Sequence, residues 1–286
     1  MLIPEKRRKA IGHARLTAFY DLLRQQGLEP IQAELGGPHE IEALVPRWRG
    51  KVDRLLIGGG DGTMNAAARA ILDSGLPFGI LPLGTANDLA RTLAIPTALA
   101  EAGRVAARGR IKAIDLGEVN GKLFFNVASI GLPVAVAEAM DEGEKARWGV
   151  AGYLLAFRRA WRSTRAFRVR IDCDGRQVSV RSIMVAVGNG RYHGGGLTVA
   201  EDAALDDGRL DLYSLRPQTL LDLALMLPAL LRGRQRAFRT VLQLQGQRIE
   251  LRTRRAKKIN VDGEVVSRTP AVFRVLPRAV RVIVPR

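Results

Sequence analysis

The chain has 286 residues, which is enough for one large domain or for two ordinary domains with separate hydrophobic cores. Hydrophobic residues make up 47% and charged residues 26% of the chain, and these values exclude a disordered protein. The 45 Lys and Arg residues outnumber the 28 Asp and Glu residues, so the net charge is +17 and an anionic partner is expected. Charge alone does not distinguish nucleic acid, anionic lipid headgroups and nucleotide phosphates.

Cys173 is the only cysteine, which excludes an intramolecular disulfide and a cysteine-based metal cluster and fits a reducing cytoplasm. The basic N-terminal segment lacks the apolar core of a signal peptide, and no run of about 18 apolar residues occurs. We therefore expect a cytoplasmic protein whose contact with a membrane is peripheral.

The first half alternates helical and short apolar segments, which indicates an α/β arrangement with a parallel sheet. We expect strands at 54–57 and 78–83 and helices at 14–26, 63–73, 88–93 and 99–108.

The second half consists of short β-branched runs, which predict antiparallel strands. We expect these strands at 167–171, 178–187, 210–215, 248–251 and 271–276, with Asp-Gly turns at 174–175, 207–208 and 262–263. A domain boundary is predicted near residue 116. Helices are expected at 149–162 and 218–232. The first combines aromatic residues with arginines, a composition typical of an interfacial helix and also compatible with a helix packed on a sheet.

The strongest motif is the glycine-rich run at 58–63, GGGDGT, placed between a predicted strand and a predicted helix. Successive glycines let backbone N–H groups approach phosphate oxygens, and the start of a helix adds its positive dipole end. The run is neither a Walker loop nor a dinucleotide fingerprint. Asp61 would be repelled by phosphates unless a cation lay between them, which favours a magnesium-bound nucleotide; a structural turn is the alternative.

A second loop, GTAND at 84–88, follows the next predicted strand and precedes a helix that Asn87 or Asp88 would cap. Ligands bind at the carboxyl ends of parallel strands, so the two loops should hold two sides of one nucleotide. Thr85 and Asn87 would supply side-chain hydrogen bonds.

The runs GGGDGTMN at 58–65 and PLGTANDLAR at 82–91 together resemble the catalytic family of diacylglycerol kinases, which includes bacterial soluble lipid kinases. This resemblance implies an α/β nucleotide-binding domain at 1–116, to which 277–286 return, and a β-sandwich lipid-substrate domain at 117–276, as in NAD kinases. The family opens with a complete strand, whereas only a stub is expected here at 1–6.

The resemblance also implies ATP and Mg²⁺ as cofactors and assigns roles to particular residues. Glu264 corresponds to the proton acceptor, with Asp262 and Asp61 as further catalytic residues. A magnesium site would lie at Ala204, Asp207 and Arg209, although an acidic surface turn is the alternative for these residues. The nucleotide site would comprise Gly59, Gly60, Asp61, Gly62, Thr63, Met64, Asn65, Gly84, Thr85 and Asn87.

The resulting hypothesis is phosphoryl transfer from ATP to a lipid hydroxyl at an anionic membrane surface, with diacylglycerol as the first candidate acceptor. Ceramide, sphingoid bases and phosphatidylglycerol are alternatives, since sequence does not show pocket shape. An NAD kinase shares the GGDGT element and is a second enzyme alternative. A basic nucleic-acid-binding protein is the alternative from another class, but no reading helix or aromatic platform supports it, so nucleic acid is not expected as a partner.

Overall fold

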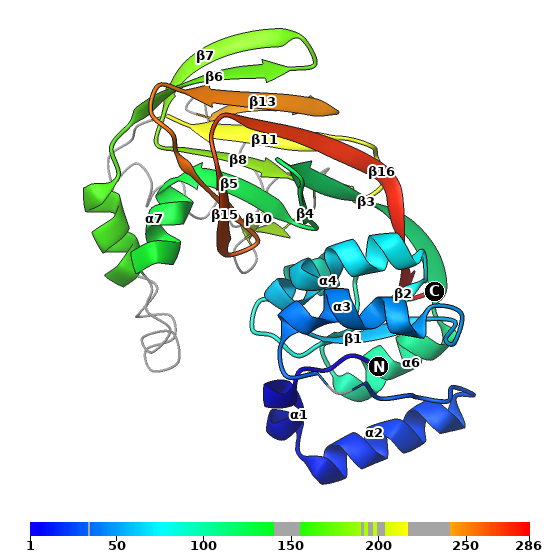
Figure 1. The fold of residues 1–286 in the computed structure, drawn as a ribbon. Coiled ribbons are helices and arrows are strands. Elements are labelled where there is room, and N and C mark those ends of the chain that lie inside the picture. Colours follow the sequence, from blue (N-terminus) through cyan, green and yellow to red (C-terminus); the bar gives the residue numbers. More distant parts are fainter. Residues whose placement is uncertain (34, 140–154, 190–191, 194–196, 199–203, 217–240) are drawn as a thin grey trace.

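The computed structural model describes residues 1–286 except 34, 140–154, 190–191, 194–196, 199–203 and 217–240. The α/β half forms the lower part of Figure 1 and the β-rich half forms the upper part. No helix within the described ranges has the length and apolar composition needed to cross a bilayer. The elements of the α/β half are α1 (Glu5–Ile11), α2 (His13–Gln25), η1 (Pro38–Glu40), α3 (Ile41–Leu44), η2 (Val45–Trp48), β1 (Leu55–Gly59), α4 (Asp61–Ser74), β2 (Phe78–Pro82), α5 (Asp88–Thr92) and α6 (Leu99–Arg108).

A parallel sheet forms the centre of this half, as the sequence predicted. β1 pairs with β2 in parallel, and β2 pairs in parallel with the end of the last strand of the chain through Phe78 and Val282. The expected N-terminal stub extends this sheet on the other side of β1. There, Leu2 forms parallel bridges with Ile57 and with Ala33. Strands buried on both faces explain why the runs that form β1 and β2 are continuously apolar.

The β-rich half contains two antiparallel layers and short helical segments. Its elements are β3 (Arg110–Val119), β4 (Lys122–Phe124), β5 (Val127–Gly131), α7 (Leu132–Ala139), a helix at 155–163, β6 (Phe167–Cys173), β7 (Arg176–Ser182), β8 (Met184–Gly188), β9 (Tyr192–His193), β10 (Leu197–Thr198), β11 (Leu210–Leu215), β12 (Val241–Gly246), β13 (Arg248–Thr253), β14 (Lys258–Val261), β15 (Glu264–Arg268) and β16 (Ala271–Val284).

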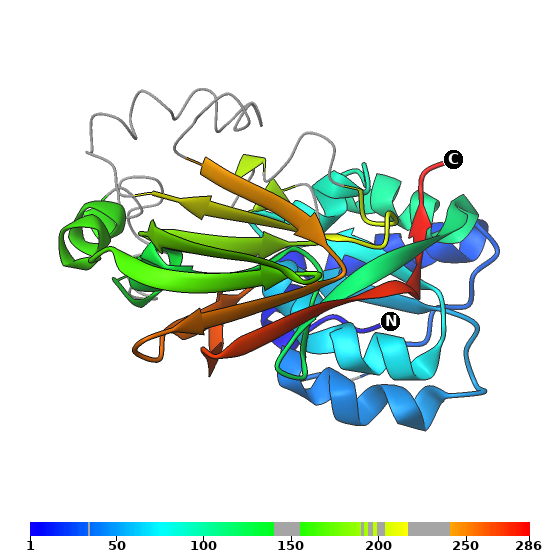
Figure 2. The same ribbon diagram turned by 90° about the horizontal axis from the view of Figure 1, so that it is seen from above.

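These two layers form a β-sandwich. Within the described residues, one layer has the order β16-β13-β6-β7, and the other has the order β12-β11-β8-β5-β14-β15. Alternate side chains from both layers form a buried cluster that includes Ile171, Val187 and Phe273. Figure 2 shows the helix at 155–163 at the end of the sandwich that lies away from the α/β half. We call this the helical end.

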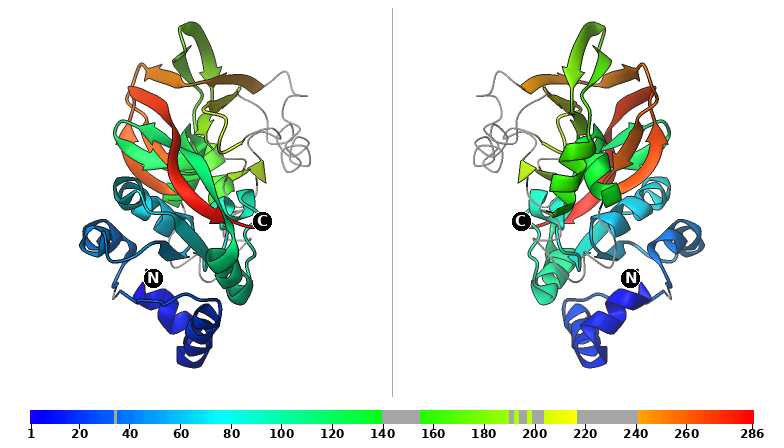
Figure 3. Two further views of the ribbon diagram at one scale, coloured as in Figure 1. Left: turned by 90° about the vertical axis from the view of Figure 1, so that its right-hand side faces the viewer. Right: turned by 90° about the vertical axis from the view of Figure 1, so that its left-hand side faces the viewer.

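Two strands run through both halves of the molecule. β3 and β16 pair antiparallel from Val119 and Phe273 in the sandwich to Arg110 and Val284 beside the parallel sheet. Figure 3 shows β16 passing continuously from one half to the other. Because β3 extends through residue 116, the predicted boundary falls inside a strand, and its position stays a prediction.

The pairing of β3 with β16 shifts register between Leu276 and Val280, where Arg278 has a positive φ of 50°. Asp115 on β3 is completely buried at this point. Its carboxylate accepts hydrogen bonds from the backbone N–H groups of Arg278 and Gly208, both at 2.7 Å. The buried charge therefore stabilises both the β-bulge and the turn before β11.

Most predicted elements agree with the structure to within a few residues, including the Asp-Gly hairpins between β6 and β7 and between β14 and β15. The prediction of a single strand at 178–187 was wrong. The segment is divided into β7 and β8, which belong to different layers. The break falls at Ile183, whose N–H donates to the Leu215 carbonyl at 2.9 Å and whose carbonyl accepts from Leu132 N–H at 3.0 Å. The hydroxyl of the preceding Ser182 lies 2.6 Å from the Met184 carbonyl and 2.9 Å from the Leu215 carbonyl and can donate to either. The helix expected at 218–232 lies outside the described residues.

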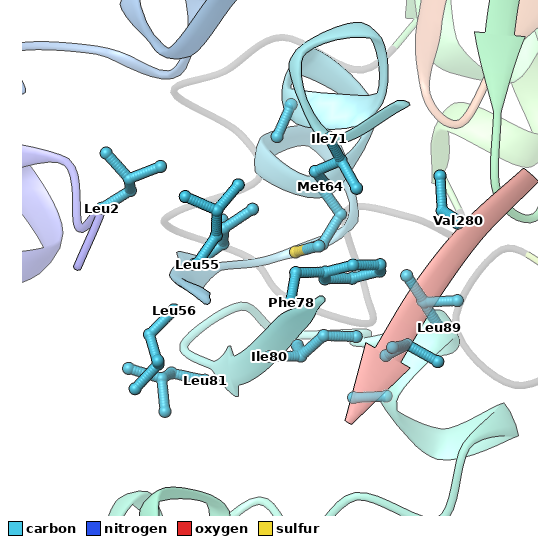
Figure 4. Close-up of a cluster of buried hydrophobic side chains, with 14 of the residues drawn as sticks. Leu2, Leu55, Leu56, Met64, Ile71, Phe78, Ile80, Leu81, Leu89 and Val280 are labelled. Atoms are coloured by element: carbon cyan, nitrogen blue, oxygen red, sulfur yellow. The ribbon is translucent and has the colours of Figure 1, made fainter. Parts of the chain in front are cut away.

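The core of the α/β half is centred on Phe78, which is completely buried between the parallel strands and α4 (Figure 4). The Phe78 ring also packs against Phe125 at the start of the sandwich half, with ring centroids 5.9 Å apart and a tilt of 53°. Offset, tilted rings are a favourable aromatic geometry, so this contact joins the two halves.

Replacing Phe78 with Ala is therefore expected to lower the free energy of unfolding by about 3–5 kcal/mol, through lost burial and the cavity that remains. Denaturant titration followed by circular dichroism measures this change. Ile111→Ala is the matched control, because Ile111 is 54% exposed and its truncation should cost about 0.5 kcal/mol or less. Equal losses for both variants would contradict the proposed place of Phe78 in the core.

Candidate active site

The two predicted glycine loops lie in direct contact. A Cβ atom built on Gly84 would lie 2.4 Å from the Cα atom of Gly60, a distance that neither backbone could accommodate without moving. Leu83 N–H also donates to the carbonyl of Gly59 at 2.9 Å. Glycine is therefore required at Gly60 and Gly84 for close approach, and the parallel pairing of β1 with β2 brings the loops together as expected.

The first loop leads directly into α4. Thr63 folds back over Gly59, where a Cβ would lie 2.3 Å from the Thr63 Oγ1 atom. No side chain caps the first turn of α4, and Thr63 N–H and Met64 N–H donate to the Gly60 carbonyl at 3.0 and 3.1 Å. The N–H groups of Asp61 and Gly62 have no partner among the described residues and are available to an anion. Met64 is 2% exposed and its side chain belongs to the hydrophobic core, so only its backbone can serve the nucleotide role expected for it.

The second loop is held together by Asn87. Its side-chain oxygen accepts from Gly84 N–H at 3.0 Å, and its amide nitrogen donates to the carbonyl of Gly84 at 2.9 Å. Asn87 is 7% exposed and adopts a left-handed conformation with φ of 51°. The amide predicted to contact the nucleotide therefore shapes the loop, whereas Thr85 is exposed.

Asp61 connects the loops to the sandwich half. Its two carboxylate oxygens accept hydrogen bonds from the N–H groups of Asp88 and Leu89, both at 3.1 Å, at the start of α5. The side-chain amide of Asn126 donates to the same carboxylate at 3.3 Å. Asn87 is the N-cap residue of α5, as one of the two expected alternatives, but its side chain makes no cap hydrogen bond, and the Asp61 carboxylate accepts from the first N–H groups of the helix instead.

Asp262 has a similar arrangement in the sandwich half. Its carboxylate accepts hydrogen bonds from three successive backbone N–H groups, those of Phe125 at 3.2 Å, Asn126 at 3.3 Å and Val127 at 2.9 Å. Asp262 and Gly263 both have positive φ and form the two-residue turn between β14 and β15. Asp262 therefore anchors this hairpin to β5.

Removal from water and the negative charge of Asp61 raise the pKa of Asp262 to about 7, although the backbone N–H donors oppose the shift. The two carboxylates are thus close enough to interact. Glu264 follows at the start of β15 and is exposed. No hydrogen bond or ion pair with another described residue engages its side chain, in contrast to Asp61 and Asp262.

Three buried asparagines around this junction were not predicted as site residues. The side-chain oxygens of Asn126 and Asn189 and the side-chain nitrogen of Asn260 have no hydrogen-bond partner among the described residues. The oxygen of Asn65, which was predicted, is also buried and unpartnered. Buried polar atoms without partners are rare in folded proteins, so these atoms mark a polar region that a ligand or water can satisfy.

The predicted magnesium residues lie in the turn before β11. The Asp207 carboxylate accepts from Arg209 N–H at 2.9 Å and from the Gln245 side chain at 3.4 Å. Burial and the nearby charge of Asp115 raise the pKa of Asp207. No group of three His, Cys, Asp or Glu side chains suited to a metal occurs within the described ranges. Sequence reasoning missed Asp115, and the available signal was an acid enclosed by the apolar residues of 113–117 within β3.

Comparisons with known proteins match both halves. Residues 5–119 match the family model of the diacylglycerol kinase catalytic domain, and residues 126–284 match the YegS C-terminal NAD kinase beta sandwich-like domain. A "Probable lipid kinase YegS-like" of Yersinia enterocolitica is 33% identical over 82% of this chain and 79% of its own length. A protein of the same description from Pseudomonas aeruginosa is 36% identical over 81% and 76%. A Bacillus subtilis protein named "Diacylglycerol kinase" is 29% identical over 82% and 78%.

The fold is also found among solved structures. A "putative diacylglycerol kinase" from Bacillus anthracis superposes with a TM-score of 0.81 and 26% identity, over 99% of this chain and 93% of the other. The two glycine loops on a parallel sheet, joined to an NAD-kinase-like β-sandwich, define a kinase. The chain belongs to the lipid kinase family that carries the diacylglycerol kinase catalytic domain.

The raised pKa of Asp262 gives a pH dependence of stability. The folded state retains a proton on Asp262 up to about pH 7, whereas an unfolded aspartate releases it at about pH 4. Folding therefore takes up a proton between these values, and the contribution of Asp262 makes the protein less stable as pH rises through this window. Asp262→Asn should remove this part of the pH dependence, as measured by urea midpoints from about pH 5 to about pH 7.5.

Asp174→Asn controls for the loss of backbone hydrogen bonds. Asp174 occupies the matching turn between β6 and β7, and its carboxylate accepts from the N–H groups of Gln247 and Arg248, both at 2.9 Å. A pH profile that is the same in wild type and in Asp262→Asn would contradict the assignment.

Proposed function

We propose that the protein phosphorylates a lipid hydroxyl with ATP in a magnesium-dependent reaction, and that diacylglycerol is its acceptor. The observation that carries this proposal is the juxtaposition of two groups at the junction of the halves. The uncapped start of α4 lies beside Gly60 and Gly84, and the sandwich half contributes Glu264, a carboxylate with no partner among the described residues. The Bacillus subtilis relative named "Diacylglycerol kinase" supports the choice of acceptor.

The nucleotide phosphates would be bound mainly by backbone. The first turn of α4 has no side-chain cap and follows the glycine run, and the helix dipole favours negative charge there. Thr85 is the exposed side chain of the second loop, and Asn65 offers an unsatisfied oxygen. Bringing both substrates into one geometry supplies much of the catalysis in phosphoryl transfer.

Glu264 would act as the general base. The lipid hydroxyl oxygen forms a bond to the γ-phosphorus, the bond between that phosphorus and the bridging oxygen of ADP breaks, and the hydroxyl proton passes to the Glu264 carboxylate. Asp61 and Asp262 are less suited to this role, since backbone N–H groups already occupy their oxygens. We assign them to positioning the loops and the hairpin that presents Glu264.

The residues at the junction fit a magnesium ion that enters with the nucleotide. Asp61 is the acid beside both glycine loops, and among the described residues its Oδ2 accepts only the hydrogen bond from Asp88 N–H, so a lone pair of this oxygen could face magnesium or one of its waters. When bound, magnesium neutralises charge on the phosphates. A second magnesium at Ala204, Asp207 and Arg209 stays a prediction. It would use the Asp207 carboxylate with backbone carbonyls and water.

The net charge of +17 supports peripheral association with the anionic inner face of the membrane, where the lipid acceptor resides. Such attraction weakens as salt rises, because exposed charges are screened. An NAD kinase activity is the competing enzyme function, and the NAD-kinase-like sandwich is the observation that favours testing it.

The wild type should transfer labelled γ-phosphate from ATP to diacylglycerol in mixed micelles, and Glu264→Gln should lower kcat about 10²- to 10⁴-fold because it cannot accept the proton. Glu101→Gln removes an exposed carboxylate on α6 and serves as the charge control. Ceramide, a sphingoid base, phosphatidylglycerol and NAD are tested in parallel. Phosphorylation of NAD alone would move the assignment to a soluble acceptor, and full activity in Glu264→Gln would exclude Glu264 as the base.

Gly84→Ala should reduce nucleotide affinity at least about tenfold, since its Cβ would push apart the two loops at Gly60. Isothermal titration with a non-hydrolysable ATP analogue measures this effect. Gly103→Ala is the matched control, because its Cβ would lie 2.5 Å from the Phe19 ring, a comparable overlap between α6 and α2. If both variants lost affinity equally, general destabilisation would account for the result.

A further inference from the structure

The outer face of one sandwich layer carries a concentration of exposed arginines at its helical end. Alternation along the strands points Val169, Ile171 and Leu251 into the core and the intervening side chains outward. We call the outward arginines, together with those of the connection that follows β13, the arginine face. It consists of six exposed residues: Arg168, Arg170, Arg181, Arg252, Arg254 and Arg255.

Strand register places four of these arginines in like-charged pairs. Arg168 on β6 lies directly opposite Arg181 on β7, and Arg170 on β6 lies directly opposite Arg252 on β13. Like charges opposite one another across antiparallel strands destabilise a sheet. Folding alone therefore does not account for two such pairs side by side, and an external anion would relieve their repulsion.

Internal acids neutralise little of this charge. Among the described residues, Glu250 pairs with Arg252 at 3.2 Å and also with Arg248, whereas Arg168, Arg170 and Arg181 form no ion pair. Asp172 and Glu250 lie opposite one another on the same outer face of β6 and β13, and the Asp172 carboxylate accepts from Gly175 N–H and the Gln177 side chain instead of pairing with an arginine. The arginine face is thus a positive surface on a rigid sheet.

We propose that the arginine face is a docking surface for the anionic headgroups of a lipid bilayer. Guanidinium groups bind phosphate through paired hydrogen bonds, and a sheet presents them over an extended surface that suits many headgroups at once. The neighbouring helix at 155–163 adds exposed Arg158 and Arg162 and the 45%-exposed Leu155, a combination suited to the interface between headgroups and acyl chains.

The position of the face also suits a lipid acceptor, and in this respect the inference rests on the proposed function. β15 runs from Glu264 at the junction to Arg268, which pairs with Lys258 at the helical end beside α7. Four residues of strand span about 13 Å, comparable to half of the roughly 30 Å hydrocarbon core. The helical end, where the arginine face lies, is therefore about one acyl chain's length along β15 from Glu264, and β15 itself belongs to the layer opposite the arginine face.

A bilayer fits this face better than nucleic acid does. The residues that share the outer face on β6, β7 and β13 are Arg, Asp, Glu, Gln and Ser, and none of them is an aromatic residue on which a base could stack. No described helix projects from this face as a groove-reading element would.

The test is co-sedimentation of the full chain with phosphatidylcholine vesicles that contain or lack phosphatidylglycerol, without ATP. The double variant Arg168→Gln/Arg181→Gln should bind the anionic vesicles about 30-fold more weakly than wild type, since each arginine near such a surface contributes about fivefold. The control Arg104→Gln/Arg108→Gln removes the same charge from exposed positions on α6 and should change binding less than about threefold.

Equal losses in both double variants would show that only net charge matters and would overturn the proposal. Vesicle binding that is unchanged in Arg168→Gln/Arg181→Gln, together with lost binding to duplex DNA, would assign the face to nucleic acid and would also overturn it. Thermal unfolding separates docking from folding, because removing a like-charged pair should not lower the melting temperature. Phosphoryl transfer is assayed separately, so failure of the kinase assignment is seen in that assay and not in sedimentation.

Discussion

The junction between the two halves depends on the carboxylate of Asp61. It belongs to the first turn of α4, it caps α5, and it receives the amide of Asn126 from the sandwich half. A single side chain thereby connects two helix starts and two halves of the molecule. Charge-assisted hydrogen bonds of this kind are stronger than neutral ones, and their loss leaves backbone donors unsatisfied. The contact between Gly60 and Gly84 persists because Asp61 holds both loops.

Acidic residues serve two different purposes in this structure. Asp61, Asp115, Asp174 and Asp262 each accept hydrogen bonds from backbone N–H groups and stabilise turns, bulges or helix starts. Glu264 differs because its side chain has no such partner among the described residues. In a chain with a net charge of +17, these four aspartates support the backbone, and Glu264 is the carboxylate near the junction whose oxygens are left for a substrate.

Sequence reasoning predicted the features that depend on local pattern. The glycine loops, the helices that follow them and the Asp-Gly hairpins all follow from backbone conformations that few residues adopt. It failed for features that depend on contacts between residues far apart in the sequence. Nothing near Asp61 in the sequence indicates that it caps a helix 27 residues away, and nothing near Asp115 indicates the bulge at Arg278. The break at Ile183 also escaped prediction, because a β-branched residue within a β-rich run indicates a continuous strand.

The path of β16 has a consequence for the order in which the chain folds. Val280, Val282 and Val284 belong to the same buried cluster as Leu55, Phe78 and the other core residues of the α/β half. During synthesis the N-terminal residues of this half emerge first, but its hydrophobic core is incomplete until residues 280–284 have left the ribosome. The N-terminal residues therefore cannot complete their core before β16 is made, in contrast to domains that fold as separate units in the order of their synthesis. Until then, the apolar side chains of β2 that pack against these valines lack their partners.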